Sequence, residues 1–176
     1  MRGLTCQRLK SYFASFLSRF SCSGASLKTE ENEMIMDGIA LIKKYEGFRS
    51  QAYKCPAGIW TIGFGSTCYA DGSPIKKGDT ISESTAEALL IDYLIKNVRP
   101  HLEGLELKEC QKAALESLIY NIGWGAFSKS KCYKALKAKD WPTFIKEYDW
   151  FSGGGKFLMG LAKRRTEELS VFFRDL

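Results

Sequence analysis

The chain has 176 residues, of which 45% are hydrophobic and 26% are charged, and its formal net charge is +6. This composition suits one globular domain with a short appendage. The sequence contains no run of about eighteen apolar residues, so we predict no ordinary transmembrane helix. Five cations and no acidic residue fall within residues 1–28, so the remainder is close to neutral. Without a Lys/Arg stripe on that remainder, we expect no nucleic-acid partner.

Residues 1–28 are patterned as a basic amphipathic helix. Its apolar face is rich in aromatic rings at helical spacing, and consists of Leu9, Tyr12, Phe13, Phe16, Leu17 and Phe20. Such a helix contacts a membrane surface, serves as an export signal or packs on the domain, and the pattern leaves these open. A polar, serine-rich linker follows, so we predict an N-terminal segment and linker over residues 1–34 and a globular domain over residues 35–176.

The first predicted helix of the domain ends at a carboxylate. Ile35, Ile39, Ile42 and Glu46 share one helical face. Gly47 follows directly and can adopt the left-handed conformation that ends a helix. The helix dipole and the apolar surroundings both favour the protonated form of Glu46. A protonated carboxyl at neutral pH is what a general acid needs.

A β-hairpin is predicted next, because short runs of β-branched and aromatic residues flank a Pro-Ala-Gly turn at residues 56–58. On its second strand, Thr61 alternates with large apolar residues and is expected to face away from them, free to meet a water or a substrate. Cys55 ends the first strand and could lie near Thr61. Each residue alone would be ordinary, but Glu46, Cys55 and Thr61 together predict an active site.

A long helix is predicted after a turn-rich loop at residues 69–74. Either Ser82 or Ser84 could cap its N-terminus, and Pro100 marks its end. Its predicted face consists of Ala86, Leu89, Leu90, Tyr93, Leu94 and Asn97. Periodicity by itself predicts only a helix here.

Three further helices are predicted towards the C-terminus. The first is a core helix that stops at Gly123, with Asn121 as a polar exception that could cap it. Its apolar residues are Ala114, Leu115, Leu118, Ile119 and Ile122. Asp140 can cap the second helix, since Pro142 is tolerated in a first turn. We interpret the three tryptophans of this region as core residues rather than sugar-stacking platforms: Trp124, Trp141 and Trp150.

A glycine run at residues 153–155 is predicted to be a loop beside the last helix. In that helix, Arg164 and Arg165 could be a solvated pair. The six cysteines have no metal-ligand spacing and the one histidine is His101, so we expect no metal site and no cofactor. Six thiols allow disulfides in an exported protein, but the sequence selects no pairing.

These residues resemble the phage-type lysozymes, the endolysins of glycoside hydrolase family twenty-four. That family has a Glu, eight residues, an Asp or less often a Cys, five residues and a Thr, followed by Gly-x-Gly. In this chain the motif is formed by Glu46, Cys55, Thr61 and residues 63–65. The resemblance continues through LIYNIGWGAF at 118–127 and KRRTEELSVFF at 163–173. Two positions depart from it, because Cys55 replaces the commoner Asp and Ser66 stands where many members have a His.

The resemblance implies an α+β, lysozyme-like fold in which a long helix joins a small β-hairpin lobe to a larger helical lobe, with a cleft between them. It implies hydrolysis of the β-1,4 bond between N-acetylmuramic acid and N-acetylglucosamine in peptidoglycan. By resemblance, Glu46 donates a proton to the leaving oxygen and Thr61 holds the attacking water. Cys55 orients that water, acts as its base or attacks the sugar itself. By resemblance, Asn121 and Arg164 would be the substrate-binding residues, with Asn121 bonding the saccharide and Arg164 pairing with Glu46.

The implied partner is the peptidoglycan glycan strand at the bacterial cell wall, and we expect a monomer. By analogy with endolysins whose active-site cysteine is masked, Cys6 or Cys22 would pair with Cys55 in a latent form. Two alternatives stay open. One is a catalytically impaired peptidoglycan-binding module of the same fold, and the other is a membrane-active peptide, residues 1–28, fused to a structural domain.

Overall fold

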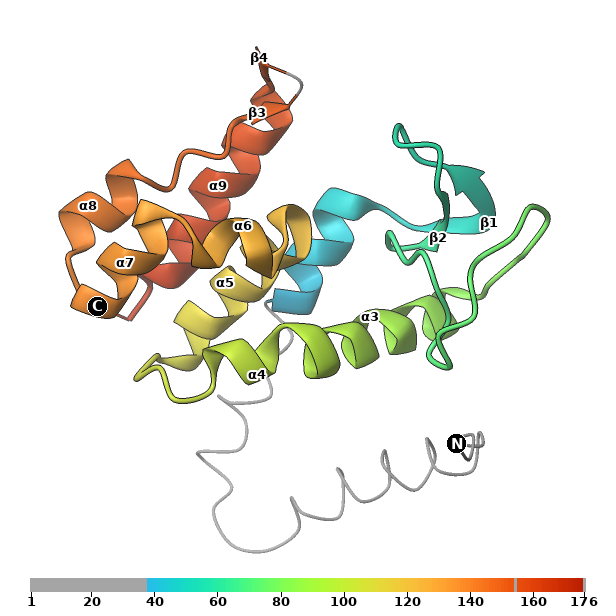
Figure 1. Cartoon of the computed structure of the whole chain (residues 1–176), viewed down its shortest axis with the longest axis horizontal. Coiled ribbons are helices and arrows are strands. Elements are labelled where there is room, and N and C mark those ends of the chain that lie inside the picture. The colour runs from blue at the N-terminus through green and yellow to red at the C-terminus, as the bar shows by residue number, and fades with distance from the viewer. Residues whose placement is uncertain (1–37, 154, 176) are drawn as a thin grey trace, which may run out of the picture.

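The computed structural model describes residues 38–153 and 155–175 (Figure 1). The segment 1–34, Ile35 and the proposed pairing of Cys6 or Cys22 therefore lie outside the described residues. A helix over residues 38–46 leads into a β-hairpin, followed by a long helix and a group of shorter helices. These first elements are β1 (Arg49–Lys54), β2 (Trp60–Gly63) and α3 (Glu83–Asn97).

The predicted two-lobed α+β arrangement is confirmed. The β1–β2 hairpin lies at one end of α3, and the helical lobe gathers around its other end (Figure 1). A second small antiparallel hairpin precedes the last helix. The elements of the helical lobe are α4 (Arg99–Leu102), α5 (Glu109–Ile122), α6 (Trp124–Ser128), α7 (Lys131–Ala138), α8 (Trp141–Lys146), β3 (Ser152–Gly153), β4 (Lys156–Phe157) and α9 (Met159–Phe172).

The helix over residues 38–46 ends as its sequence predicts. Ile39 and Ile42 are buried in the core, while Glu46 at its end is half-buried. Gly47 has φ +68°, and its N–H donates to the carbonyl of Lys43 at 3.0 Å. A residue without a Cβ adopts this left-handed conformation without strain, so the chain turns sharply towards the hairpin just after Glu46.

The predicted hairpin is also confirmed. Strands β1 and β2 are antiparallel, and Tyr53 lies opposite Thr61. The turn closes where Cys55 N–H donates to the carbonyl of Ile59 at 2.9 Å and Gly58 N–H donates to the carbonyl of Cys55 at 2.8 Å. The register is irregular nearer the start of β1, so the end that carries Cys55 is the regular one.

Helix α3 matches one of its two predicted caps and differs from its predicted buried face. Its N-cap is Ser82, whose hydroxyl accepts from Thr85 N–H at 3.1 Å. Tyr93 and Asn97 are exposed, because only a narrow stripe of α3 is covered by the rest of the protein. That buried stripe consists of Ala86, Leu90 and Leu94.

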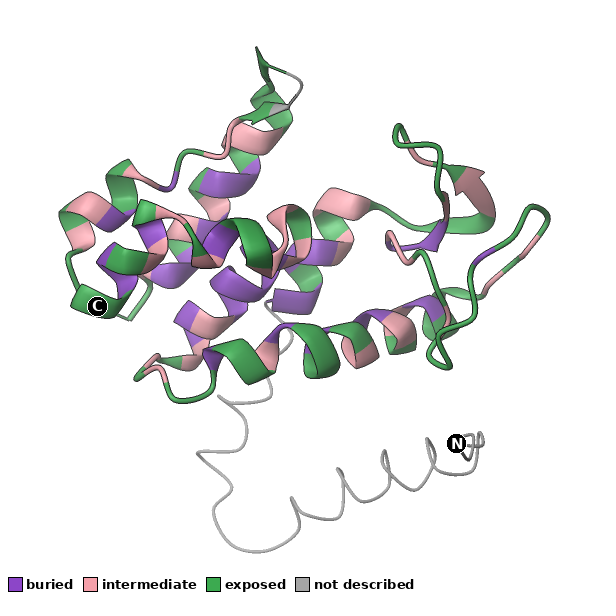
Figure 2. Cartoon of the chain, in the orientation of Figure 1, coloured by how far each residue is buried: buried purple, intermediate pink, exposed green. Residues whose placement is uncertain are grey.

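Helix α5 lies at the centre of the helical lobe, and its purple ribbon in Figure 2 marks an almost continuously buried element. It packs along α9, and the core also includes the stacked rings of Phe144 and Phe172, whose centroids are 4.6 Å apart. The predicted stop at Gly123 is confirmed, with φ +82° and an N–H that donates to Ile119 at 2.8 Å. Burying one such large apolar side chain contributes about 1.5–3 kcal/mol.

Other predictions for the helical lobe have mixed outcomes. Asp140 does cap α8, accepting from Thr143 N–H at 3.2 Å. Of the glycine run, Gly153 ends β3 and Gly155 lies in the turn before β4, while residue 154 is outside the described residues. The interpretation of Arg164 and Arg165 as a solvated pair was wrong, because the exposed fractions of these residues are 3% and 0%. The three tryptophans are partly buried against the core, as interpreted: Trp124, Trp141 and Trp150.

Within residues 38–153 and 155–175, no helix is long and apolar enough to cross a membrane. The cysteines of this part of the chain are free thiols, namely Cys55, Cys68, Cys110 and Cys132.

Candidate active site

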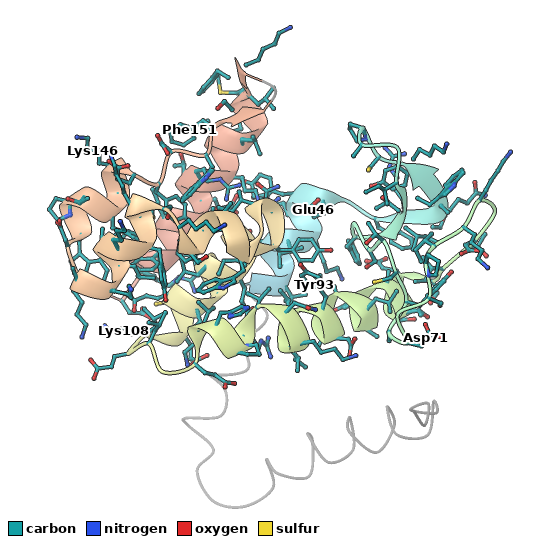
Figure 3. All side chains as sticks on the ribbon, viewed as in Figure 1. Glu46, Asp71, Tyr93, Lys108, Lys146 and Phe151 are labelled. Atoms are coloured by element: carbon teal, nitrogen blue, oxygen red, sulfur yellow. The ribbon has the colours of Figure 1, made fainter. Side chains whose placement is uncertain are left out.

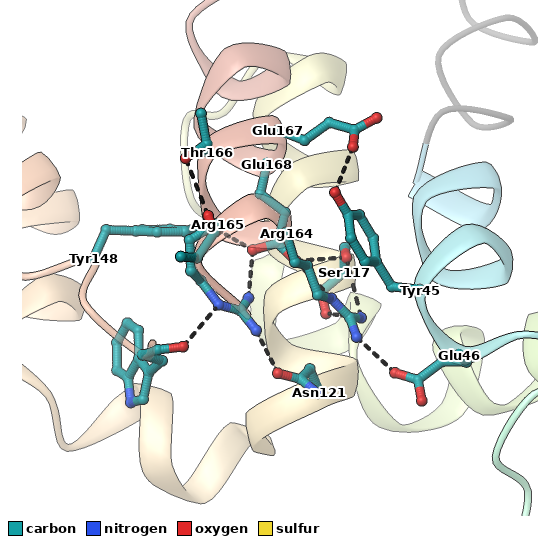
Figure 4. A network of polar contacts seen from close by, with 12 residues as sticks. Tyr45, Glu46, Ser117, Asn121, Tyr148, Arg164, Arg165, Thr166, Glu167 and Glu168 are labelled. Atoms are coloured by element: carbon teal, nitrogen blue, oxygen red, sulfur yellow. Dashed lines mark hydrogen bonds and ion pairs between the residues drawn. The ribbon is translucent and has the colours of Figure 1, made fainter. Parts of the chain in front are cut away.

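Glu46, labelled at the end of its helix in Figure 3, points towards α9, where it meets an arginine (Figure 4). Arg164 Nη1 donates to Glu46 Oε1 at 2.7 Å, so the pairing expected from the resemblance is present. The Glu46 side chain is 25% exposed, whereas that of Arg164 is 3% exposed. The guanidinium attracts the negatively charged carboxylate, an effect that opposes the dipole and burial effects considered from sequence alone.

Arg164 is fixed by two other groups. Its Nε donates to Glu168 Oε1 at 3.1 Å, one turn further along α9. Its Nη2 donates to the carbonyl of Ser117 at 3.0 Å and to the Ser117 hydroxyl at 3.2 Å, both on α5. Because the planar guanidinium is held on all sides, the nitrogen that meets Glu46 has a fixed position.

The neighbouring arginine connects the same network to Asn121. Arg165 Nη2 donates to Asn121 Oδ1, its Nη1 donates to Glu168 Oε2, and its Nε donates to the carbonyl of Trp150 at 3.3 Å (Figure 4). Asn121 itself is exposed at the end of α5. Its side-chain oxygen is therefore directed inward, which turns the amide nitrogen away from Arg165.

The second oxygen of Glu46 faces the turn that follows β2. A Cβ on Gly65 would lie 3.8 Å from Glu46 Oε2 and 3.3 Å from the hydroxyl of Tyr120, and Gly65 has φ +104°. The absence of a side chain there allows both oxygens to approach the backbone. The Tyr120 hydroxyl donates to the carbonyl of Phe64 at 2.8 Å, and burial raises the pKa of Tyr120 above its usual range.

Cys55 and Thr61 lie together at the closed end of the hairpin. The backbone N–H of Ile59 lowers the pKa of the half-buried Cys55 thiol, and the N–H of Ala57 and the Thr61 hydroxyl act in the same direction. Contrary to the expected open face, Thr61 is 4% exposed, and its hydroxyl donates to the carbonyl of Ile59 at 3.1 Å. Strand alternation predicts the side of a hairpin, but not whether another segment covers that side.

The predicted residues thus form two groups joined by one turn. The acid group is Glu46 with Arg164, extended to Asn121, and the hairpin group is Cys55 with Thr61. The turn around Gly65 contacts the acid on one side and follows β2 on the other. The sequence argument missed four residues of this arrangement: Ser117, Tyr120, Tyr148 and Glu168.

The site's donors do not suit a metal ion. In the described part of the chain, no cluster of three or more His, Cys, Asp or Glu side chains could hold one. The buried Glu168 carboxylate already accepts from two arginines.

Comparisons with known proteins match this chain along most of its length. The family described as phage lysozyme matches residues 43–168. The endolysin of Acyrthosiphon pisum secondary endosymbiont phage 1 is 37% identical over 143 residues, covering 77% of this chain and 94% of that protein. The endolysin of Salmonella phage P22 is 33% identical over 138 residues, covering 77% of this chain and 94% of that protein. Among solved structures, the endolysin from Escherichia coli O157:H7 phage FAHEc1 superposes with a TM-score of 0.69 at 30% identity, covering 80% of this chain and 92% of that one.

Proposed function

The chain belongs to the phage lysozyme family and hydrolyses the β-1,4 bond of peptidoglycan, and we propose that Glu46 is the proton donor of this reaction. The carboxyl has two distinct oxygens, of which Oε1 accepts from Arg164 at 2.7 Å and Oε2 faces Gly65. This asymmetry supports Oε2 as the oxygen that carries the proton to the leaving sugar. General acid catalysis of this kind contributes about a hundred to ten-thousandfold in rate.

We propose that Thr61 and Cys55 orient and activate the attacking water. Because the Thr61 hydroxyl donates to the Ile59 carbonyl, its lone pairs can accept a hydrogen bond from that water. The N–H groups around Cys55 lower the pKa of its thiol, which supports a thiolate that accepts a proton. In the reaction, the water oxygen bonds to the anomeric carbon while the glycosidic bond breaks. The water proton passes to Cys55 and the Glu46 proton passes to the leaving oxygen, which inverts the anomeric configuration.

We propose that Asn121 binds the sugar chain. Its oxygen accepts from Arg165, so its amide nitrogen is available to donate to a carbonyl or hydroxyl oxygen of the glycan. Arg164, which was expected to bind substrate, is almost fully buried and engaged with protein groups. Its proposed contribution is to position Glu46.

The single observation that carries the acid assignment is the fixed, half-buried contact between Glu46 and Arg164. Glu46→Gln should reduce reducing-end release from purified peptidoglycan by at least about a hundredfold while retaining the fold. Glu167→Gln is a matched control, since Glu167 is a carboxylate of similar exposure that pairs with Lys44 instead. Robust release by Glu46→Gln would exclude the acid role.

Reducing-end release also tests the alternative function and the role of Asn121. A catalytically impaired binding module would bind peptidoglycan but release no reducing ends in the unsubstituted protein. Asn121→Ala should raise KM more than it lowers kcat, because the amide is proposed to bind rather than react. The anomer formed first, observed by proton NMR, tests Cys55: net retention would mean that its thiolate attacks the sugar.

We further propose that residues 35–176 form the catalytic domain, that the protein acts as a monomer, and that residues 1–28 contact anionic membrane surfaces. The family match at residues 43–168 falls within the proposed domain. The five cations of residues 1–28, with no acidic residue among them, support the membrane contact. Endolysins act at the bacterial cell wall, and we propose that this chain acts there too.

A further inference from the structure

We propose that Glu168 is a positioning residue of the enzyme: its buried carboxylate holds Arg164 against Glu46 and balances the charge that Glu46 experiences. This inference rests on the proposed acid role of Glu46 and deepens it. Glu168 lies on α9 at i+4 from Arg164 and i+3 from Arg165, and it touches neither Glu46 nor a sugar-facing group directly.

The Glu168 carboxylate is 0% exposed and accepts four hydrogen bonds, two on each oxygen. Oε1 accepts from Arg164 Nε at 3.1 Å and from the Ser117 hydroxyl at 2.6 Å. Oε2 accepts from Arg165 Nη1 and from the Tyr148 hydroxyl at 3.2 Å. A carboxylate has about four acceptor sites, so Glu168 is saturated by protein groups and does not itself exchange protons with substrate.

This cluster is electrically balanced only when Glu168 is charged. Arg164 and Arg165 are buried cations, and burying a cation is strongly unfavourable unless an anion pairs with it. Glu168 contacts both arginines, and Glu46 contacts Arg164 alone. When Glu46 is ionised, two positive and two negative charges offset each other across the α5–α9 interface; when Glu46 carries its proton, Glu168 is the carboxylate that pairs with both arginines.

The other ionisable groups around the cluster leave this balance unchanged. Three of these groups are phenols that stay neutral near pH 7. They are Tyr45 on the helix over residues 38–46, Tyr120 on α5 and Tyr148 after α8. Burial raises the pKa of Tyr45 to about 12. Glu167, the adjacent acid on α9, is occupied at the surface by Lys44.

Removing the charge of Glu168 should therefore change how Glu46 titrates. With a neutral residue at position 168, Glu46 becomes the one anion that faces two buried arginines. Its carboxylate form gains stability, and Glu46 loses its proton at a lower pH. A general acid must be protonated, so the alkaline limb of the activity profile should move in the same direction.

Glu168→Gln tests this, since it keeps the shape and removes the charge. The Glu46 carboxyl carbon, followed by carbon-13 NMR at constant ionic strength, should titrate about one pH unit lower than in the unsubstituted protein. The alkaline limb of kcat/KM for reducing-end release should shift equally. Glu168→Asp keeps the charge, so Glu46 should titrate close to where it does in the unsubstituted protein.

Two further variants separate positioning by charge from loss of packing. Tyr148→Phe removes one donor to Glu168 without changing any charge. The pH at which Glu46 titrates should therefore differ from that of the unsubstituted protein by no more than about 0.3 pH units, much less than in Glu168→Gln. Arg165→Met removes a cation, so the Glu46 titration should move to higher pH, which provides a test of opposite sign if Glu168→Gln fails to fold.

An unchanged Glu46 titration in folded Glu168→Gln or folded Arg165→Met would overturn the proposal. So would an equal shift in Tyr148→Phe. The NMR titration does not depend on catalysis, so it remains decisive even if Glu46→Gln proves active and the acid role fails. Conversely, an inactive Glu46→Gln with an unmoved titration in Glu168→Gln would reject only the role of Glu168.

Discussion

Replacing Gly63 with alanine should loosen the joint between the hairpin lobe and the long helix. Gly63 has φ +65°, and a Cβ there would lie 2.7 Å from the Cβ of Ala86 on α3. Real Cβ atoms do not approach this closely, and Ala86 has no flexible side chain that could move aside. The backbone of β2 or of α3 would have to shift instead.

The expected cost has two parts. Left-handed backbone costs a residue with a Cβ about 1–2 kcal/mol, and overpacking a tight contact costs about 1–3 kcal/mol. Gly58→Ala is a matched control, because Gly58 has φ +80° in the same hairpin but no heavy atom within 4 Å of the added Cβ. The difference between the two variants, about 1–3 kcal/mol, isolates the contact with Ala86. It corresponds to a Tm difference of about 2–12 °C for a protein of this size.

Denaturant unfolding of five proteins tests this reasoning: the unsubstituted chain, the single variants Gly63→Ala, Gly58→Ala and Ala86→Gly, and the double variant Gly63→Ala with Ala86→Gly. The double variant removes the clashing Cβ and leaves the Ala86 Cα as the next atom, at 3.5 Å from the new Cβ. We therefore expect the double variant to lose less unfolding free energy than the two single variants lose together, by at least about 1 kcal/mol. A Gly63→Ala variant as stable as Gly58→Ala, or no recovery of stability when Ala86→Gly is added to Gly63→Ala, would refute a clash between the two Cβ atoms. Because Thr61 lies two residues before Gly63 on β2, Gly63→Ala should also lower activity at temperatures where the protein is folded.

Two other predictions follow. Burial raises the pKa of Glu116 although Arg99 pairs with it at 2.7 Å, so the stability that this group contributes is complete below about pH 4 and is lost as pH rises through the folded-state pKa. Relative to Glu116→Gln, the unsubstituted protein should therefore lose unfolding free energy as the pH rises above about 4, and a pH-independent difference would contradict this. Separately, the full chain should sediment with vesicles containing anionic lipid but not with zwitterionic ones, and Arg8→Gln with Lys10→Gln should weaken this binding; equal sedimentation with both vesicles would argue against a charged membrane contact.

Local signals predicted the element boundaries that matter most for the site. Gly47 and Gly123 end their helices with positive φ, and Asp140 caps α8, because each effect depends on one residue and its immediate neighbours. The cap of α3 was ambiguous since Ser82 and Ser84 both have suitable spacing. Only the structure shows which serine stands outside the helix and accepts from the first turn.

Local sequence pattern could not predict the pairing of the acid with its arginine. Glu46 and Arg164 are separated by 118 positions in the chain, so their pairing followed from resemblance alone. Glu168 could have been found from its i,i+4 spacing to Arg164, a spacing that places two side chains on one helical face. The burial of Glu168 could not have been predicted from the sequence, because charged residues at such spacing are usually solvated.

The buried charges also explain how α9 finds its register on α5. Ser117 and Asn121 lie four residues apart on α5, and Arg164 and Glu168 lie four residues apart on α9, so each helix presents polar groups one turn apart. Sliding either helix by one turn would break the contacts of Arg164 with Ser117 and of Arg165 with Asn121, with the loss of several charge-assisted hydrogen bonds. An apolar interface alone would tolerate that slip far better. The polar seam therefore selects the one register that brings Arg164 to the end of the helix over residues 38–46, where Glu46 meets it.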